Sequence, residues 1–336
     1  MLCDKLITDH KKNDDIVYRN QFKNADFMTI SKLANKVTGN YKDFEGLYEW
    51  IFNCIEKKKE FGYKHVIIDE GQDFGLIDHT VNDDAWSEEQ NISIIDALQE
   101  AALENKGTFY LFYDKYQMIQ GGSNISYELP DCIANSDRRL TLHQNCRNTL
   151  EISKTSLTPI KDKNNRSIRN KVAFSWEEPI NPIMHFTEEN QNEKLVKILD
   201  KLITNEVKDI IILTTGSLEK SGIADHLKFS ADINDSFAYY KYNKKEYKVT
   251  TCIRYKGLEA EAIVMIDLNK NSFVPKKGLE FYVGASRAKH YLDLIYTMSP
   301  EEYYEVAHQI DTNAPNRKKP ERMRKVLANI FSATIE

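Results

Sequence analysis

Residues 65–74 read His-Val-Ile-Ile-Asp-Glu-Gly-Gln-Asp-Phe. A short β-branched run ends there in two adjacent carboxylates, and a run of this length with Gly71 just beyond it predicts a buried parallel strand followed by a loop. Because ligands of open α/β sheets bind beyond the carboxyl ends of the strands, Asp69 and Glu70 should lie at a ligand-binding edge. Two carboxylates suit a Mg²⁺-nucleotide site, although the pair alone is equally typical of a strand end with solvated acids.

Composition places the chain among folded globular proteins. Its 336 residues are 41% hydrophobic and 29% charged, which excludes the disordered class and allows one large or two ordinary domains. No apolar run approaches the roughly 18 residues that span a membrane, and the N-terminus lacks a signal-peptide pattern. The five cysteines contain no Cys-x-x-Cys pair, which argues against zinc or disulfides and favours a reducing cytoplasm. Because the net charge is −5, any nucleic-acid contact must come from a local groove.

The continuation of the first stretch, Gln72 followed by Asp73, is more specific. Asp-Glu-x-Gln-Asp directly after a strand resembles the Walker B element of superfamily 1 helicases of the UvrD/Rep type. The resemblance implies that Asp69 holds Mg²⁺, that Glu70 activates the attacking water and that Gln72 contacts the nucleotide. Since this family carries its remaining motifs in a fixed order, the rest of the chain can be compared with that order.

A second apolar run, at 108–114, also ends in a carboxylate and continues as Lys-Tyr-Gln. It resembles motif III of the same helicases. The resemblance implies that Gln117 senses the γ-phosphate and that Tyr116 faces the path of the nucleic acid, where aromatic side chains stack on bases. The aromatic residues of the run itself are expected to pack in the core; they are Tyr110, Phe112 and Tyr113.

Residues 140–149 read Leu-Thr-Leu-His-Gln-Asn-Cys-Arg-Asn-Thr and resemble motif IV. The planar guanidinium of Arg147 suits a γ-phosphate oxygen, whereas an isolated arginine at a helix start is ordinarily a solvated charge. Cys146 stands where the family usually has an aromatic residue that stacks on the adenine. We therefore expect the phosphate contact and not the base contact.

The most specific match lies at 247–267, which resembles motif V: two strands flank a loop that contains Lys-Gly-Leu-Glu. Gly257 is expected to make a tight turn that opens a helical turn, whose amides can meet anions. The resemblance implies that Glu259 reaches the nucleotide ribose or a phosphate-bound water, and that Thr251 contacts the nucleic-acid backbone.

Residues 281–296 resemble motif VI. Arg287 would then be the arginine finger that neutralises charge developing on the transferred phosphoryl group. The competing interpretation is a surface ion pair.

Near the N-terminus, residues 2–10 and 27–36 loosely resemble motifs Ia and Ib. The resemblance implies that Thr29 and Ser31 contact phosphates, and Ser31 is also expected to be a helix N-cap. An ordinary strand and helix cap explain these segments equally well.

Periodicity predicts several further elements. Apolar residues spaced three and four apart predict amphipathic helices, and a β-branched run predicts a buried strand at 209–215. The proline-containing stretch at 156–182 is expected to be a linker or surface excursion, and the basic tail at 317–325 a solvated helix. Helices are expected over 41–62, 91–104, 191–205 and 218–227.

One motif of the family is missing from the sequence. No Gly-x-x-x-x-Gly-Lys-(Ser/Thr) string, the P-loop that holds the β- and γ-phosphates, occurs in the chain. In the family this string precedes motif Ia, so we expect the chain to begin after it. Three explanations remain open: a fragment of a longer motor, a split motor whose P-loop comes from a separate chain, or a degenerate motor retained as a scaffold.

The resemblance implies a fold and a function together. We expect two RecA-like α/β domains with parallel sheets, the first (1–150) truncated and the second over 151–336. As a complete machine this would be an ATP- and Mg²⁺-dependent translocase or helicase on single-stranded DNA, with RNA left open, in bacterial DNA repair or phage defence by family analogy. The alternatives are an inactive scaffold that binds a protein or nucleic acid, and, much less well supported, a metal-dependent nuclease using Asp69, Glu70 and Asp73.

Overall fold

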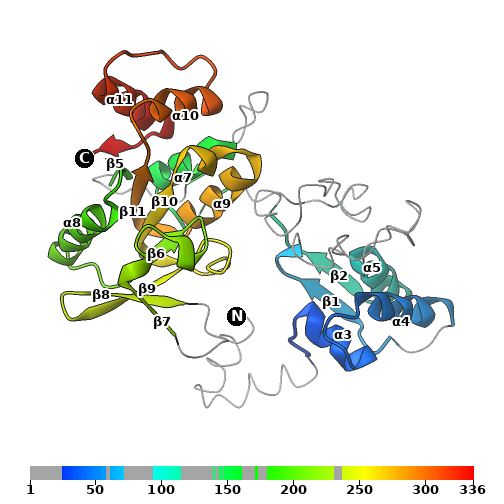
Figure 1. Ribbon diagram of the computed structural model, residues 1–336. Helices are drawn as coiled ribbons and strands as arrows, with labels where there is room; N and C mark the ends of the chain where they lie inside the picture. Colours follow the sequence, from blue (N-terminus) through cyan, green and yellow to red (C-terminus); the bar gives the residue numbers. More distant parts are fainter. Residues whose placement is uncertain are drawn as a thin grey trace, which may run out of the picture. The chain divides into compact units, whose positions relative to one another are not determined.

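The computed structural model describes residues 25–57, 61–71, 94–114, 138, 140, 144–145, 147–160, 171–172, 180–230 and 237–336. The chain forms two compact units, Met1–Leu140 and Thr141–Glu336 (Figure 1). The division falls ten residues before the boundary expected at 150. The motif IV segment belongs to the second unit, because the Asn148 side chain is hydrogen-bonded to backbone carbonyls of that unit.

The first unit contains a two-stranded parallel sheet, in which β1 (His65–Ile68) pairs with β2 (Thr108–Leu111). Side chains alternate across the two strands, so Ile68 and Leu111 face the core while Ile67 and Tyr110 face away. Three amphipathic helices cover the core face: α3 (Ile30–Thr38), α4 (Phe44–Glu56) and α5 (Ile94–Glu104).

The expected core packing of the motif III aromatics is wrong. Tyr110 and Phe112 are 56% and 54% exposed, and Tyr113 is 37% exposed. For Tyr110 the reason is that only one face of this sheet carries helices among the described residues; Phe112 and Tyr113 lie beyond the end of β2. The strand was predicted correctly, but the face that each side chain would occupy was not.

The second unit is built on an eight-stranded sheet with the order β12-β5-β11-β10-β6-β9-β8-β7. Every neighbouring pair is parallel except the two pairs that β8 makes. The strands are β5 (Ile183–Thr187), β6 (Ile210–Thr214), β7 (Leu227–Phe229), β8 (Ala238–Tyr242), β9 (Lys245–Thr251), β10 (Ala260–Leu268), β11 (Ala288–Thr297) and β12 (Thr334–Ile335). A short separate pair joins β3 (Gln144–Asn145) to β4 (Lys171–Val172).

Both faces of this sheet are buried, which explains why its central strands are continuous apolar runs. On β10, Ile263 and Met265 face one core cluster, whereas Val264 and Ile266 face the other. Side chains of α8 (Gln191–Thr204) contribute to the second cluster. Helices of the first cluster are α7 (Leu150–Leu157), α9 (Pro275–Ala285), α10 (Glu302–Ile310) and α11 (Pro320–Phe331).

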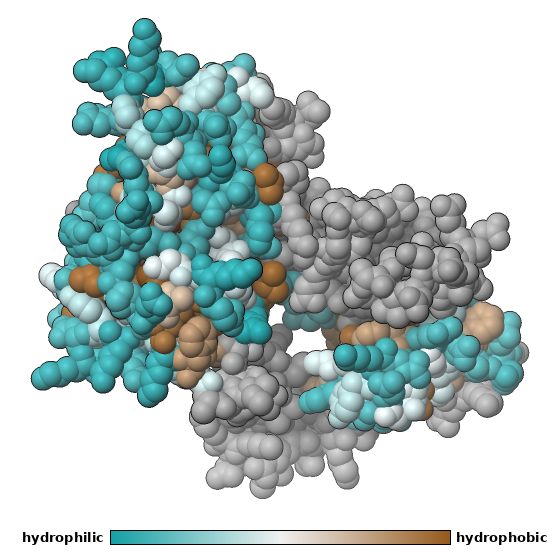
Figure 2. Space-filling view, viewed as in Figure 1, coloured by the Kyte–Doolittle hydropathy of each residue, from teal (hydrophilic) through white to brown (hydrophobic). Residues whose placement is uncertain are grey.

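Two expectations for the second unit are corrected. In place of one helix over 218–227 there are two 3₁₀ turns, Leu218–Lys220 and Ala224–His226. They are separated where Ser221 and Gly222 donate hydrogen bonds to the Asp267 carboxylate. The basic tail at 317–325 is largely exposed as expected and enters a helix, α11, but Met323 within it is buried, and Leu327 and Phe331 further along the helix are buried in the core. The surface over α10 and α11 is largely hydrophilic (Figure 2).

No helix among the described residues is both long and apolar enough to cross a membrane.

Candidate functional site

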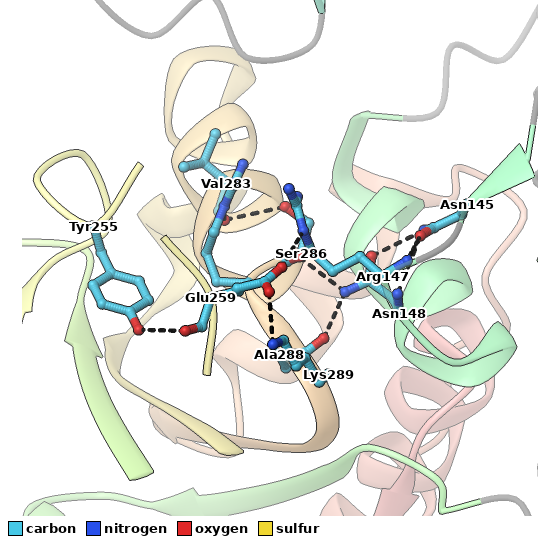
Figure 3. A network of polar contacts seen from close by, with 10 residues as sticks. Asn145, Arg147, Asn148, Tyr255, Glu259, Val283, Ser286, Ala288 and Lys289 are labelled. Atoms are coloured by element: carbon cyan, nitrogen blue, oxygen red, sulfur yellow. Dashed lines mark hydrogen bonds and ion pairs between the residues drawn. The ribbon is translucent and has the colours of Figure 1, made fainter. Parts of the chain in front are cut away.

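A cluster of charged side chains lies where β10 and β11 begin. Glu259, one residue before β10, accepts a hydrogen bond from Arg147 Nε at 3.1 Å through Oε2, and one from Lys289 Nζ at 2.6 Å through Oε1. Arg147 precedes α7, and Lys289 is the second residue of β11. The side chains of Arg147 and Lys289 converge on Glu259 (Figure 3). All three are between 38% and 42% exposed, so a ligand can reach the cluster. Two of the sequence-predicted residues, Arg147 and Glu259, are thus in direct contact.

Two asparagines fix the backbone that carries Arg147. Asn145 Oδ1 accepts hydrogen bonds from the backbone N–H groups of Arg147 and Asn148, at 2.9 and 3.1 Å. The buried Asn148 side chain then donates through Nδ2 to the carbonyls of Ser286 and Ala288. These two carbonyls flank Arg287, so Asn148 ties the motif IV segment directly to the motif VI segment (Figure 3).

Arg287 itself is buried. Only 1% of the residue is exposed, and its Nε donates to the Val283 carbonyl at 3.0 Å. Its backbone carbonyl accepts a hydrogen bond from Ala260 N, next to Glu259. The backbone of Arg287 therefore adjoins the charged cluster, whereas its guanidinium packs inside the unit. Its part as an arginine finger stays a prediction.

The loop before Glu259 is a turn and not the start of a helix, contrary to expectation. Residues 252–257 form turns and β10 follows at Ala260. Gly257 has a φ of +81°, a left-handed conformation that glycine adopts without steric cost, so the tight turn predicted there is present. Tyr255 anchors the turn, since its hydroxyl donates to the Glu259 carbonyl at 3.0 Å, and burial raises the pKa of Tyr255.

The electrostatics of the cluster keep Glu259 ionised. The hydrogen bond from Lys289 lowers the pKa of Glu259, partial burial opposes that change, and the charges of Lys289 and Arg147 lower it further. One anion therefore faces two cations, which leaves a local net positive charge. Among the described residues, Arg147 donates hydrogen bonds only through Nε and its backbone N–H. Its terminal nitrogens are the donors that a phosphate or carboxylate ligand would use.

Thr251, the predicted nucleic-acid contact, ends β9. Its hydroxyl accepts a hydrogen bond from Arg254 N at 3.2 Å, which stabilises the first turn of the loop. Thr251 is half-buried, and Arg254 is exposed beside it. The described contact is structural, and it leaves the hydroxyl proton able to donate to another acceptor.

In the first unit, Asp69 and Glu70 follow β1 as predicted, at the carboxyl end of the sheet. Glu70 has a φ of +54°, a left-handed conformation that is strained for a residue with a Cβ, and its N–H is bonded to Asp69 Oδ1 at 3.0 Å. Gly71 donates to the Phe112 carbonyl, and a Cβ at this position would lie 2.4 Å from Leu111 Cδ1. A side chain at position 71 would therefore have to displace the end of the Leu111 side chain where the two strands end.

The pair Asp69 and Glu70 is a partial fit to a metal site. Among the described residues no group of three or more histidine, cysteine, aspartate or glutamate side chains could hold a metal ion. Mg²⁺, however, keeps several waters and typically binds one or two carboxylates together with substrate phosphates. The exposed Asp69 carboxylate can provide such a ligand.

The remaining predicted residues divide into two groups. Gln72, Tyr116 and Gln117 lie outside the described residues. Thr29 is the N-cap of α3, where its hydroxyl accepts from Lys32 N at 3.2 Å; the N-cap expected at Ser31 is wrong, because the helix already begins at Ile30.

Sequence reasoning missed three residues that organise the second unit. Lys289 and Asn148 are each within two positions of a predicted arginine, and this proximity was the available signal. Asp267, at the other end of β10, had none. It has a φ of +60°, and its carboxylate accepts hydrogen bonds from Gln191, Thr214, Ser221 and Gly222.

Comparisons with known proteins give a distant structural match. No protein-family model matches the chain, and no curated protein matches it. Among solved structures, the crystal structure of the C-terminal domain of a possible DNA helicase from Lactobacillus plantarum WCFS1 is similar, with 17% sequence identity and a TM-score of 0.33. The match covers 47% of this chain and 92% of that one. The chain is a mixed α/β protein with a parallel-rich sheet.

Proposed function

We propose that this chain belongs to an ATP-dependent motor of the UvrD/Rep type that moves along single-stranded DNA, with two RecA-like units. The observation that carries the proposal is the contact of Arg147 with Glu259, beside the backbone of Arg287. These residues come from three motifs that the sequence places in the helicase order, and the fold of the second unit gathers them at one end of two adjacent strands.

The cluster has the charge that a nucleotide phosphate requires. Arg147 and Lys289 present two cations around one carboxylate, and a phosphate oxygen can take hydrogen bonds from the guanidinium edge that Glu259 leaves unoccupied. Glu259 holds both cations in place before the ligand arrives, which reduces the ordering cost of binding. Asn148 keeps Arg147 in register with motif VI.

The first unit carries two adjacent carboxylates, Asp69 and Glu70, directly after β1. Asp69 would hold Mg²⁺ together with the nucleotide, and Mg²⁺ when bound neutralises phosphate charge. Glu70 would accept the proton of the attacking water, and its strained backbone is of the kind that is found at functional sites. Because the sequence has no P-loop string, we propose that this element comes from a segment outside the sequence or from a partner protein.

The second candidate function is an inactive helicase-like scaffold. Two observations favour it: the Arg287 side chain is buried against Val283, and Glu259 is already engaged by two cations. In a scaffold, Arg287 would serve packing alone, and Arg147 would serve only its ion pair with Glu259. The two candidates therefore differ in whether the exposed Arg147 contributes to nucleotide binding.

The test measures binding of a fluorescent ATP analogue with Mg²⁺, and hydrolysis stimulated by single-stranded DNA. It uses the purified chain alone, with any co-purifying protein, and with a separately expressed segment that carries a P-loop. A motor predicts binding that Arg147→Ala weakens roughly tenfold or more and hydrolysis that Glu70→Gln abolishes. Arg322→Ala, at an exposed arginine of α11, is the matched control and should change neither quantity. Absence of binding and hydrolysis in all three preparations would favour the scaffold.

A further inference from the structure

One face of the antiparallel ribbon β7-β8-β9 carries lysines around a tyrosine. Strand register places Lys228 opposite Tyr239, and Tyr239 opposite Lys248, so the three side chains form a row across the ribbon. Residues directly opposite on antiparallel strands project from the same face, about 5 Å apart. Lys241 lies on this face two residues along β8, directly opposite Glu246 of β9. We call these four residues, Lys228, Tyr239, Lys241 and Lys248, the lysine–tyrosine face.

The opposite face of the ribbon packs against α8 and the core, so the row of lysines and Tyr239 must point away from α8. Tyr240 donates its hydroxyl to Asn192 Oδ1 at 2.6 Å, and Tyr242 donates to Asp200 Oδ1 at 2.8 Å, so both point toward α8. Tyr247 and Val249 are buried in the same core cluster. By alternation, the lysine–tyrosine face points away from α8. Its three lysines are exposed and Tyr239 is half-buried.

The ribbon is basic within an acidic chain. Its three strands and the turn at 243–244 contain five lysines (228, 241, 244, 245 and 248) and one carboxylate, Glu246, whereas the whole chain has a net charge of −5. Lys248 also lies over the ring of Phe237, with its Nζ 5.3 Å from the ring centroid. Figure 2 shows hydrophilic and hydrophobic side chains next to each other over this part of the unit.

Edge protection alone does not explain this pattern. A lysine on an edge strand discourages aggregation, and Lys228 on β7 can serve that purpose. Lys241 and Lys248, however, lie on β8 and β9, which are paired on both sides. A solvated face would also not need an aromatic ring between two ammonium groups. The combination suits a ligand with both phosphates and flat bases.

We propose that the lysine–tyrosine face binds single-stranded nucleic acid, with the backbone phosphates at Lys228 and Lys248 and a base stacked on Tyr239. The inference rests on the proposed function and extends it, because β9 leads from Lys248 into the loop at 252–257, about 10 Å further along the strand. The strand bound at the motif V loop would therefore continue over the ribbon. No residue of the charged cluster at Glu259 takes part in it.

The test is fluorescence anisotropy of labelled oligo(dT) and oligo(rU) on the full chain without nucleotide, over a range of salt concentrations. Lys228→Gln with Lys248→Gln should reduce the slope of log K against log salt by about 1.4, from two phosphates at about 0.7 each. Tyr239→Ser should weaken binding roughly 5- to 100-fold, whereas Tyr239→Phe should retain most of it. Lys197→Gln with Lys201→Gln on α8 removes the same charge elsewhere and should leave both quantities unchanged.

The outcomes separate this inference from the proposed function. If the wild-type chain binds oligonucleotide and the Lys228→Gln, Lys248→Gln double variant binds it with the same affinity, the inference is overturned. The proposed motor function is not affected by that result. The inference is also overturned if Tyr239→Ser keeps the wild-type affinity and heparin competes as effectively as oligonucleotide. These two results together would show a surface that binds polyanions in general. A wild-type chain that binds neither oligonucleotide contradicts the inference and the nucleic-acid part of the proposed function together. A photo-crosslink from bromodeoxyuridine to Tyr239 would support it directly.

Discussion

Glu259 Oε2 accepts a hydrogen bond at 3.1 Å from Nε of Arg147, a residue 112 positions earlier in the chain. The other carboxylate oxygen of Glu259 accepts from Lys289, at 2.6 Å. One side chain thus joins the segments that resemble motifs IV, V and VI.

Glu259→Gln should make the second unit less sensitive to acid. The pKa of Glu259 is lowered in the folded chain, so its stabilising contribution is present above the unfolded pKa of about 4.3 and is lost as the pH falls through the folded pKa. The variant lacks this contribution at every pH. Because the three side chains are about 40% exposed, the difference at neutral pH should be at most about 1 kcal/mol.

The test of Glu259→Gln measures the urea concentration at which half of the second unit is unfolded, at several pH values between 7 and 3. Pulse proteolysis reports the fraction that is folded at each urea concentration. Wild-type and variant midpoints should converge as the pH falls. Glu246→Gln, at an exposed carboxylate of β9, is the matched control and should run parallel to the wild type. A constant offset at all pH values for Glu259→Gln would show that Glu259 acts only through packing.

Asn148→Ala should destabilise the second unit by about 2–3 kcal/mol. The change leaves the carbonyls of Ser286 and Ala288 without the donor that Asn148 Nδ2 supplies in a buried setting. Urea unfolding measures the loss. Asn313→Ala, at an exposed asparagine, should stay within about 0.5 kcal/mol of the wild type. Equal effects of the two substitutions would contradict a structural role for the clamp.

Glu70→Gly should be more stable than Glu70→Gln, by about 0.5–1 kcal/mol. Both variants remove the carboxylate, but only glycine relieves the left-handed backbone at φ +54°. Lys106→Gly tests the backbone effect alone, because Lys106 has a φ of +53° after α5 and should show a similar gain over Lys106→Gln. Hydrogen exchange of the first unit measures each pair. A more stable Glu70→Gln would mean that contacts of the side chain outweigh the strain.

Leu327→Ala should cost about 2–5 kcal/mol, because Leu327 of α11 is fully buried in the larger core cluster. Lys325→Ala, on the exposed side of the same helix, should change stability by no more than about 0.5 kcal/mol. Urea midpoints of the two variants provide the comparison. A small effect of Leu327→Ala would contradict the burial of this side of α11 in the core.

Much of the second unit could be predicted from local pattern. The apolar runs of β6 and β10 and the three-four spacing of α8 mark elements that the structure confirms to within one or two residues. Prediction failed where a distant contact decides the local structure. The predicted helix over 218–227 is divided because the Asp267 carboxylate, more than 40 residues later, takes the donors of Ser221 and Gly222. No local pattern contains that contact.

By itself, the sequence determined the α/β class, the central strands of the second unit and the order of the residues that resemble helicase motifs. Those properties depend on side-chain periodicity and on spacing along the chain. Only the tertiary structure decided that Glu259 pairs with Arg147 and Lys289, that the Arg287 side chain is buried and that Tyr110 is exposed. The physical reason is that burial and ion pairing depend on which elements pack on each face, and the partners lie far apart in the chain.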